Sequence, residues 1–244
     1  AEPDRFTDES KQFSTLASLV PGNLDGWLTL HQRYGSLDVR RLFQPAIDYA
    51  ENGFPITYFG SATISMQAHL LMSYPDSATA FLDGTSALVP GTRIRQPHLA
   101  DTLRQIVEGG RETFYRGELA HRIVKGNQEL GGLFTEDDFA EYQSEWQDPI
   151  YIDYCGYQVF TTPPNSSAFQ VLQTLKLMEI FEVAFQNTDT VHYLMEVIKL
   201  CITDRIEYAG DPDYVRAPLK GLLSGDYAQV QKERINLIRT TSVS

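Results

Sequence analysis

Apolar residues recur at the three- and four-residue spacing of helices along most of this chain of 244 residues. Glycine or proline interrupts each such stretch where a helix would begin or end. The clearest exception is residues 150–162, where β-branched and aromatic residues flank Cys155-Gly156, a pattern typical of two strands joined by a tight turn. No linker or internal repeat divides the chain, so the sequence predicts a helix-rich α+β fold in a single domain over residues 1–244.

Helices are expected where an apolar period, a capping residue and a helix breaker agree. The expected helices run from Asn23 to Gly35, from Asp38 to Pro45, from Pro45 to Gly53, through residues 55–72, from Pro97 to Gly109-Gly110, from Glu118 to about Leu130, from Thr135 through Tyr142, from a cap in residues 163–167 to about Glu182, from Thr188 or Asp189 to about Tyr208, and over residues 226–238. The stretch 74–95 is rich in glycine and proline and predicts a loop with short strands.

Three of these expectations depend on single residues. Pro45 lacks an N–H group, so we expect it to begin a new helix rather than to lie inside one. Thr135 followed by Asp138 predicts a capping box. In the longest helix, the helical period places an apolar stripe on the inward face, made of Val191, Leu194, Ile198 and Ile202.

Charge and hydropathy exclude several classes of protein. Acidic residues outnumber basic ones by 32 to 20, and the net charge of -12 disfavours nucleic acid or an anionic membrane as the main partner. No apolar run approaches the roughly 18–20 residues of a membrane span, and residues 1–10 lack the pattern of a secretion signal. Cys155 and Cys201 are in no metal or redox spacing and have apolar or aromatic neighbours; we expect buried free thiols, with a disulfide as the alternative.

Local catalytic and ligand-binding motifs are missing from the sequence. It contains no phosphate-binding loop, no dinucleotide fingerprint, no H-E-x-x-H pair and no G-x-S-x-G turn. The five histidines never fall four residues apart, so we expect each to lie at the surface or in packing rather than on a metal. The acidic run 136–138 stands at a predicted helix start, where carboxylates favour the helix dipole. From the residues alone, the chain is an acidic, helix-rich α+β protein without an assigned active site.

A series of short strings nevertheless resembles one family, in the same order from about residue 20 to 230. These strings are Val20-Pro21-Gly22, Gln44-Pro45-Ala46, Gly53-Phe54, Gln96-Pro97, Phe114-Tyr115-Arg116-Gly117, Gly131-Gly132-Leu133, Asp153-Tyr154, Gly156-Tyr157, Pro163-Pro164, and Asp204-Arg205-x-Glu207-Tyr208-x-Gly210-Asp211-Pro212-Asp213-Tyr214-Val215. The chain resembles the large subunit of γ-glutamyltranspeptidases, which are N-terminal-nucleophile hydrolases.

The resemblance implies a proenzyme that cuts itself before a threonine and yields two subunits, which share one αββα sandwich. This chain would be the middle and C-terminal part of the large subunit. The threonine nucleophile would head the small subunit, and the arginine that binds the substrate carboxylate would lie upstream. The resemblance therefore implies no catalytic, substrate-binding or metal-binding residue in this chain, and no cofactor. Its partners would be that small subunit and a γ-glutamyl or related amide; the compartment would be periplasmic or secreted, with a cytoplasmic location open.

Three places in the sequence leave alternatives. Where the family carries Pro-Pro-Pro-Ser-Ser-Gly-Gly, residues 163–169 read Pro-Pro-Asn-Ser-Ser-Ala-Phe, which indicates either ordinary drift or a reshaped pocket. The last five residues, 240–244, faintly resemble the family's processing point and receive no role. Arg205, Glu207 and Asp211 are interpreted as an ion pair followed by a helix-ending turn; alternatively, this turn shapes the approach to the processing site.

The resemblance also leaves the function open between related classes. The principal hypothesis is an enzyme that transfers or hydrolyses γ-glutamyl amides. A specialised amidase, acylase or biosynthetic relative and a non-catalytic scaffold of the same fold are the alternatives. Since a two-stranded hairpin alone is marginal in water, we expect a strand of the small subunit to pair with residues 150–162, and the isolated chain to be poorly folded.

Overall fold

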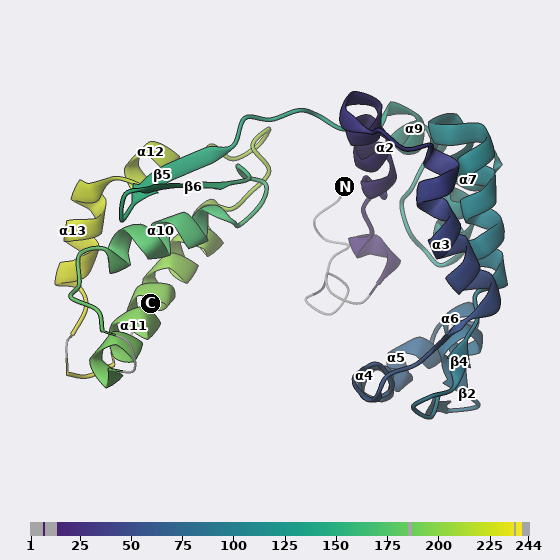
Figure 1. Cartoon of the computed structure of the whole chain (residues 1–244), viewed down its shortest axis with the longest axis horizontal. Coiled ribbons are helices and arrows are strands. Elements are labelled where there is room, and N and C mark those ends of the chain that lie inside the picture. The colour runs from purple at the N-terminus through teal and green to yellow at the C-terminus, as the bar shows by residue number, and fades with distance from the viewer. Residues whose placement is uncertain (1–6, 8–13, 185–186, 237, 241–244) are drawn as a thin grey trace. The chain divides into compact units, whose positions relative to one another are not determined.

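Two units, Ala1–Glu145 and Trp146–Ser244, divide the chain, and each has a hydrophobic core of its own. The computed structural model describes residue 7 and residues 14–184, 187–236 and 238–240. Figure 1 shows both units and labels most of their helices and strands. Within the described residues, no helix combines the length and the apolar character needed to cross a membrane.

The first unit is built around a set of packed helices. Its main elements are α2 (Asn23–Tyr34), α3 (Val39–Asn52), α7 (Pro97–Tyr115), α8 (Glu118–Glu129) and α9 (Glu136–Glu141). Helix α3 lies along α7 (Figure 1), and the contact buries Ile47, Ala50 and Ala100. Helix α7 is interrupted at Gly110, whose φ of 60° and ψ of -149° are not helical. A second cluster joins α2, α7, α8 and α9; it consists of Leu24, Ile106, Tyr115, Leu119, Ala120, Val124 and Phe139.

Short elements complete the first unit. They are the 3-10 helix η2 (Thr15–Ala17), the helices α4 (Tyr58–Met66), α5 (Ala68–Met72) and α6 (Pro75–Phe81), and the strands β1 (Phe54–Pro55), β2 (Leu82–Asp83), β3 (Ser86–Ala87) and β4 (Arg93–Ile94). Strand β1 pairs with β4, and β2 pairs with β3, both antiparallel. These pairs are only two residues long, so they close loops rather than form a sheet core.

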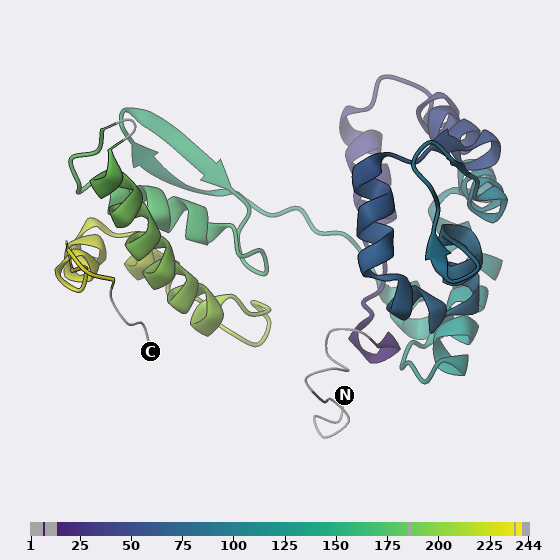
Figure 2. The same ribbon diagram turned by 90° about the horizontal axis from the view of Figure 1, so that it is seen from below.

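The second unit combines one hairpin with helices. Its elements are β5 (Ile150–Tyr154), β6 (Tyr157–Thr161), α10 (Phe169–Met178), α11 (Thr188–Tyr208), α12 (Leu219–Leu222) and α13 (Gly225–Glu233). The hairpin lies against α10, which in turn packs on α11 and α13 (Figure 2). Its core contains Leu177, Met178, Val197, Leu200, Cys201, Ala228 and Ile235.

Several local predictions are confirmed. The Asp38 side chain caps α3 by accepting the Arg40 N–H at 2.8 Å. Thr135 and Asp138 form the predicted capping box at the start of α9. The hairpin turns at Cys155-Gly156, and its strands pair in register from Ile150↔Thr161 to Tyr154↔Tyr157. The helix-rich α+β class is therefore correct.

Other predictions about the elements are wrong. Pro45 lies inside α3 rather than at a helix start; the carbonyl that loses its helical partner belongs to Arg41, an exposed residue that solvent can reach. Asn23 is the first residue of α2 and not its cap, which is Gly22. Residues 75–81 form α6 with Pro75 in its first turn, where the stretch was expected to be a loop with strands.

The buried face of α11 also differs from the prediction. Of the predicted stripe, Val191 and Leu194 are 60% and 38% exposed, while Ile198 and Ile202 are partly buried; Val197 and Leu200, which the prediction left out, are buried. Cys201 is buried as expected, but Cys155 is exposed because it occupies the hairpin turn with a φ of 49°. Both thiols are free.

The described strands form three separate two-stranded sheets. Within the described residues, β5 and β6 pair only with each other, so each keeps one unpaired edge. The αββα sandwich and the single domain over 1–244 stay predictions that concern the assembled protein.

Candidate functional site

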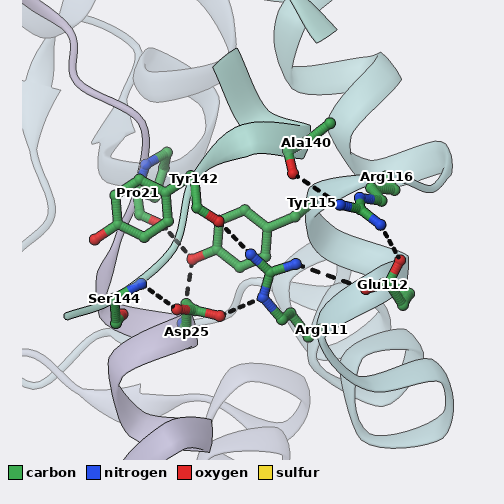
Figure 3. Close-up of polar contacts among 9 residues, drawn as sticks. All are labelled: Pro21, Asp25, Arg111, Glu112, Tyr115, Arg116, Ala140, Tyr142 and Ser144. Carbon is green, nitrogen blue, oxygen red and sulfur yellow. Dashed lines mark hydrogen bonds and ion pairs between the residues drawn. The ribbon is translucent and has the colours of Figure 1, made fainter. Parts of the chain in front are cut away.

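A buried carboxylate stands at the start of α2. Asp25 follows Leu24, whose burial in the core carries the first turn of α2 inward and leaves Asp25 only 2% exposed. One carboxylate oxygen accepts the Ser144 backbone N–H at 2.6 Å, and the other accepts the Nε–H of Arg111. Figure 3 shows these groups meeting between α2, the end of α7 and the segment after α9.

The guanidinium of Arg111 continues the network. It donates to the backbone carbonyl of Tyr142 and lies 4.9 Å from the centre of the Tyr115 ring. Tyr115 stacks on Tyr142 with ring centres 5.7 Å apart, and its hydroxyl donates to the carbonyl of Pro21 at 2.6 Å. The same hydroxyl accepts the Asp25 N–H at 3.1 Å. Three segments far apart in the sequence are therefore joined through one cluster (Figure 3).

A glycine beside this cluster is required by close packing. A Cβ on Gly22 would lie 2.0 Å from the Tyr142 hydroxyl oxygen. Any side chain there would displace the tyrosine ring from its stack on Tyr115. This contact gives a physical reason for the glycine in the string Val20-Pro21-Gly22.

The electrostatics of the cluster suit a structural role. Burial alone would raise the pKa of Asp25, but hydrogen bonds from Ser144 and Arg111 outweigh it and hold that pKa below its usual value. Burial raises the pKa of Tyr115. At neutral pH, Asp25 is charged and paired and Tyr115 is neutral. Both groups are occupied by protein partners, so the cluster cross-links the unit and offers no reactive atom to a substrate.

A second polar cluster lies in the other unit, around Asp204 of α11. The Tyr227 hydroxyl donates to the carboxylate at 2.9 Å, and the Gln173 side-chain amide donates to it as well. Burial first, and then the neighbouring Asp204, raises the pKa of Tyr227 to about 12. Asp204 is the first residue of the longest family-like string. Its hydrogen bonds give that string a structural role, because they join α11 to α10 and α13.

The two cysteines do not form a nucleophilic site. Burial raises the pKa of Cys201 to about 11, which leaves almost no thiolate at neutral pH. Cys155 lies on the exposed hairpin turn, where its backbone N–H donates to Glu179 at 3.3 Å. No general base among the described hydrogen-bond partners addresses either thiol.

Three of the five histidines make structural contacts within the protein, in line with the sequence prediction. His31 contacts the Leu37 carbonyl at 2.6 Å, His121 pairs with Glu136 at 2.8 Å, and His192 contacts the Asn236 carbonyl at 2.8 Å. In the part of the chain that the structure describes, no group of three or more His, Cys, Asp or Glu side chains could hold a metal ion.

The structure also describes the two family-like strings for which the sequence left alternatives, residues 163–169 and the string from Arg205 to Asp211. Phe169 begins α10 and is fully buried, so the residue that replaces a family glycine fills the core. The Asp211 side chain accepts the Asp213 N–H at 3.0 Å and its carbonyl accepts the Val215 N–H at 2.7 Å, which confirms the predicted turn. Among the described residues, no ion pair joins Arg205 to Glu207, so that part of the interpretation is wrong.

No sequence signal locates either polar cluster. Asp25 and Arg111 are 86 positions apart, and Asp204 and Tyr227 are 23 apart. Each residue alone reads as an ordinary helix residue, and only the fold brings the partners together. The prediction that this chain holds no catalytic, substrate-binding or metal-binding residue is not tested by this geometry.

Known proteins resemble the chain over nearly all of its length. It is 38% identical over 225 residues to the glutathione hydrolase-like YwrD proenzyme of Bacillus subtilis (strain 168), covering 91% of this chain and 43% of that protein. The chain thus spans less than half the length of this relative.

Solved structures agree with the sequence comparison. The crystal structure of Helicobacter pylori gamma-glutamyltranspeptidase matches with a TM-score of 0.89 and 29% identity, covering 96% of this chain and 69% of that chain. Cephalosporin acylase from Bacillus halodurans matches with a TM-score of 0.83 and 34% identity, covering 88% of this chain and 42% of that chain. The family model described as gamma-glutamyltranspeptidase matches residues 1–244. The chain therefore belongs to the γ-glutamyltranspeptidase family.

Proposed function

We propose that this chain is a large-subunit segment of a γ-glutamyltranspeptidase-like enzyme, which transfers or hydrolyses γ-glutamyl amides. The observation that carries the proposal is the family match over residues 1–244, in a chain that spans 43% of a proenzyme relative. The described residues supply cores and cross-links, while the reactive groups come from the rest of the protein. The chain alone is therefore inert.

The chemistry belongs to a threonine at the head of the partner subunit. Its hydroxyl attacks the γ-glutamyl amide carbonyl, and its own α-amine takes up the proton. An α-amine with a pKa of roughly 7.7–8.0 suits this task at neutral pH. The amine of the donor leaves, and water or an acceptor amine then attacks the acyl-enzyme ester and releases the threonine.

The hairpin supports a shared αββα sandwich. Ile152 is buried on the face that meets α10, while Tyr151 and Phe160 lie together on the other face and are 52% and 55% exposed. A sheet covered by helices on one side and bearing exposed aromatics on the other is suited to packing on a second sheet. In this proposal, the partner subunit supplies that sheet and strands for the free edges, and both units join one domain.

The complete precursor tests the proposal. Expressed in full, it should yield two chains, and mass spectrometry should show that the smaller one begins with threonine. The complex should turn over γ-glutamyl-p-nitroanilide, and replacement of that threonine by alanine should abolish both cleavage and turnover. An uncleaved precursor without turnover would overturn the proposal.

A specialised acylase is the second candidate, and two observations favour it. Ala168-Phe169 replaces the family's glycine pair, and the cephalosporin acylase of Bacillus halodurans is among the structural matches. The same complex would then cleave the side-chain amide of a cephalosporin and leave γ-glutamyl-p-nitroanilide intact. Assaying both substrates on one preparation separates the two functions.

A further inference from the structure

The segment that follows α13 returns along α11. The Asn236 side chain accepts the N–H groups of Ile238 and Arg239 at 2.9 Å each, which ties it to these two residues. The ring of His192 contacts the Asn236 carbonyl at 2.8 Å and holds Asn236 on α11. The path of the chain after α13 is thus set by specific contacts.

Thr240 is held by a charged pair on the same helix. Its hydroxyl donates to Glu196 Oε1 at 3.1 Å and accepts from Lys199 Nζ at 2.8 Å. Glu196 and Lys199 themselves approach to 2.6 Å. The Glu196 side chain is only 3% exposed, and a carboxylate so buried is costly unless partners satisfy it. Lys199 and the Thr240 hydroxyl are two of these partners.

The order of these contacts gives the segment a direction. His192, Glu196 and Lys199 are spaced four and three residues apart, so they share one face of α11. Asn236 meets the first of them and Thr240 meets the other two. The segment therefore advances toward the C-terminal end of α11, by roughly 10 Å of helix rise between positions 192 and 199.

We propose that His192, Glu196 and Lys199 form a guide that fixes the exit path of the polypeptide from the large-subunit fold, so that the precursor presents its processing threonine for self-cleavage. The inference rests on the proposed function. In self-cleavage, the threonine hydroxyl adds to the preceding carbonyl and the C–N bond breaks; water then hydrolyses the ester, leaving a carboxylate and a free threonine amine. A guided approach raises the rate of such a step by restricting the motion of the reacting segment.

Thr240 offers a matched pair of variants for the test. Thr240→Val keeps the shape and removes the hydroxyl, whereas Thr240→Ser keeps the hydroxyl. Thr240 is exposed, so neither change threatens the core. In a cell-free translation time course of the complete precursor, Thr240→Val should slow the appearance of the two subunits by about 3- to 10-fold, the size expected for the net loss of one ordinary hydrogen bond. Thr240→Ser should cleave at the wild-type rate.

Turnover separates this role from a general structural one. Once processed, both variants should show kcat and KM within about twofold of the wild type, since the guide acts before maturation. Equal cleavage rates for wild type and Thr240→Val would overturn the guide while leaving the proposed function intact. A parallel loss of kcat in processed Thr240→Val would also overturn it, because the segment would then serve the mature site. A wild-type precursor that never cleaves would overturn the proposed function and the guide together.

Discussion

The carboxylate of Asp25 holds three segments of the first unit, so its charge is worth testing on its own. Asp25→Asn keeps the shape but removes the closer of two carboxylates from Arg111, which is 28% exposed and keeps Glu112 at 3.6 Å. We expect a loss of about 2–3 kcal/mol, below the full cost of breaking a buried pair because Arg111 reaches solvent. The thermal midpoint of the processed complex should fall by about 2–5 °C, because the shift for a given free energy shrinks as the protein grows.

Asp101 supplies the control for this substitution. It forms an exposed ion pair with Arg104 at 3.0 Å, and its side chain is 64% exposed. Asp101→Asn should leave the midpoint almost unchanged, since exposed pairs contribute little. If both variants shift the midpoint equally, the buried network does not stabilise the unit in the way described.

The lowered pKa of Asp25 gives this contribution a pH dependence. A carboxyl with a depressed pKa in the folded state adds stability that is complete above its unfolded pKa, roughly 3.9, and disappears as the pH falls through its folded pKa. The gap in midpoint between wild type and Asp25→Asn should therefore be constant from pH 7 to 5 and narrow below about pH 4. Thermal melts across this range measure the gap. A gap that stayed constant below pH 4 would contradict the assigned charge state.

At the scale of elements, the break in α7 is the feature that brings Arg111 and Tyr115 to Asp25. Gly110 adopts a φ and ψ that only glycine reaches readily, although a Cβ there would meet nothing within 4 Å. Gly110→Ala should thus cost about 1–3 kcal/mol through backbone strain alone. Gly126 lies within α8 with equal space around it, and Gly126→Ala should stabilise by up to about 1 kcal/mol. Chemical denaturation of both variants checks the opposite signs.

Elements set by local chemistry were predictable from the sequence. The Asp38 cap, the box of Thr135 with Asp138 and the turn at Cys155-Gly156 each depend on neighbours a few residues away. Where the predictions of elements were wrong, tertiary packing had overridden the local signal. Helix α3 continues through Pro45 because its Ile47 and Ala50 face is buried on α7, which outweighs one missing hydrogen bond.

The polar clusters could not be predicted for a related reason. Asp25 finds Arg111 only after α2 and α7 have packed, and no local pattern encodes a partner 86 positions away. The prediction of the buried face of α11 was wrong for a different reason. Val191 and Leu194 lie on the apolar stripe that the helical period indicates, yet they are exposed in the described structure. An apolar stripe predicts burial, but the sequence does not say which chain provides the cover.

For the whole molecule, this exposed apolar surface implies dependence on the rest of the protein. The outer face of the hairpin and the N-terminal part of α11, with Val191 and Leu194, leave large apolar side chains in solvent. We expect residues 1–244, expressed alone, to aggregate or to melt without a cooperative transition, while the complete protein melts cooperatively. A monomeric, cooperative melt of the isolated chain, measured by calorimetry with light scattering, would contradict this.

Substitution of Phe160 tests the same idea more sharply. It should be favourable in the isolated chain and destabilising in the complete protein. Phe160 is 55% exposed and lies 5.2 Å from Tyr151, ring centre to ring centre, on the hairpin face that the proposed second sheet would cover. In the isolated chain, Phe160→Ser removes exposed apolar surface and should lower aggregation. In the complete protein, the same change would cut into a core between two sheets and should cost about 3–5 kcal/mol. Light scattering on the first and denaturation of the second give both signs, and a neutral effect in the complete protein would show that this face stays open to solvent.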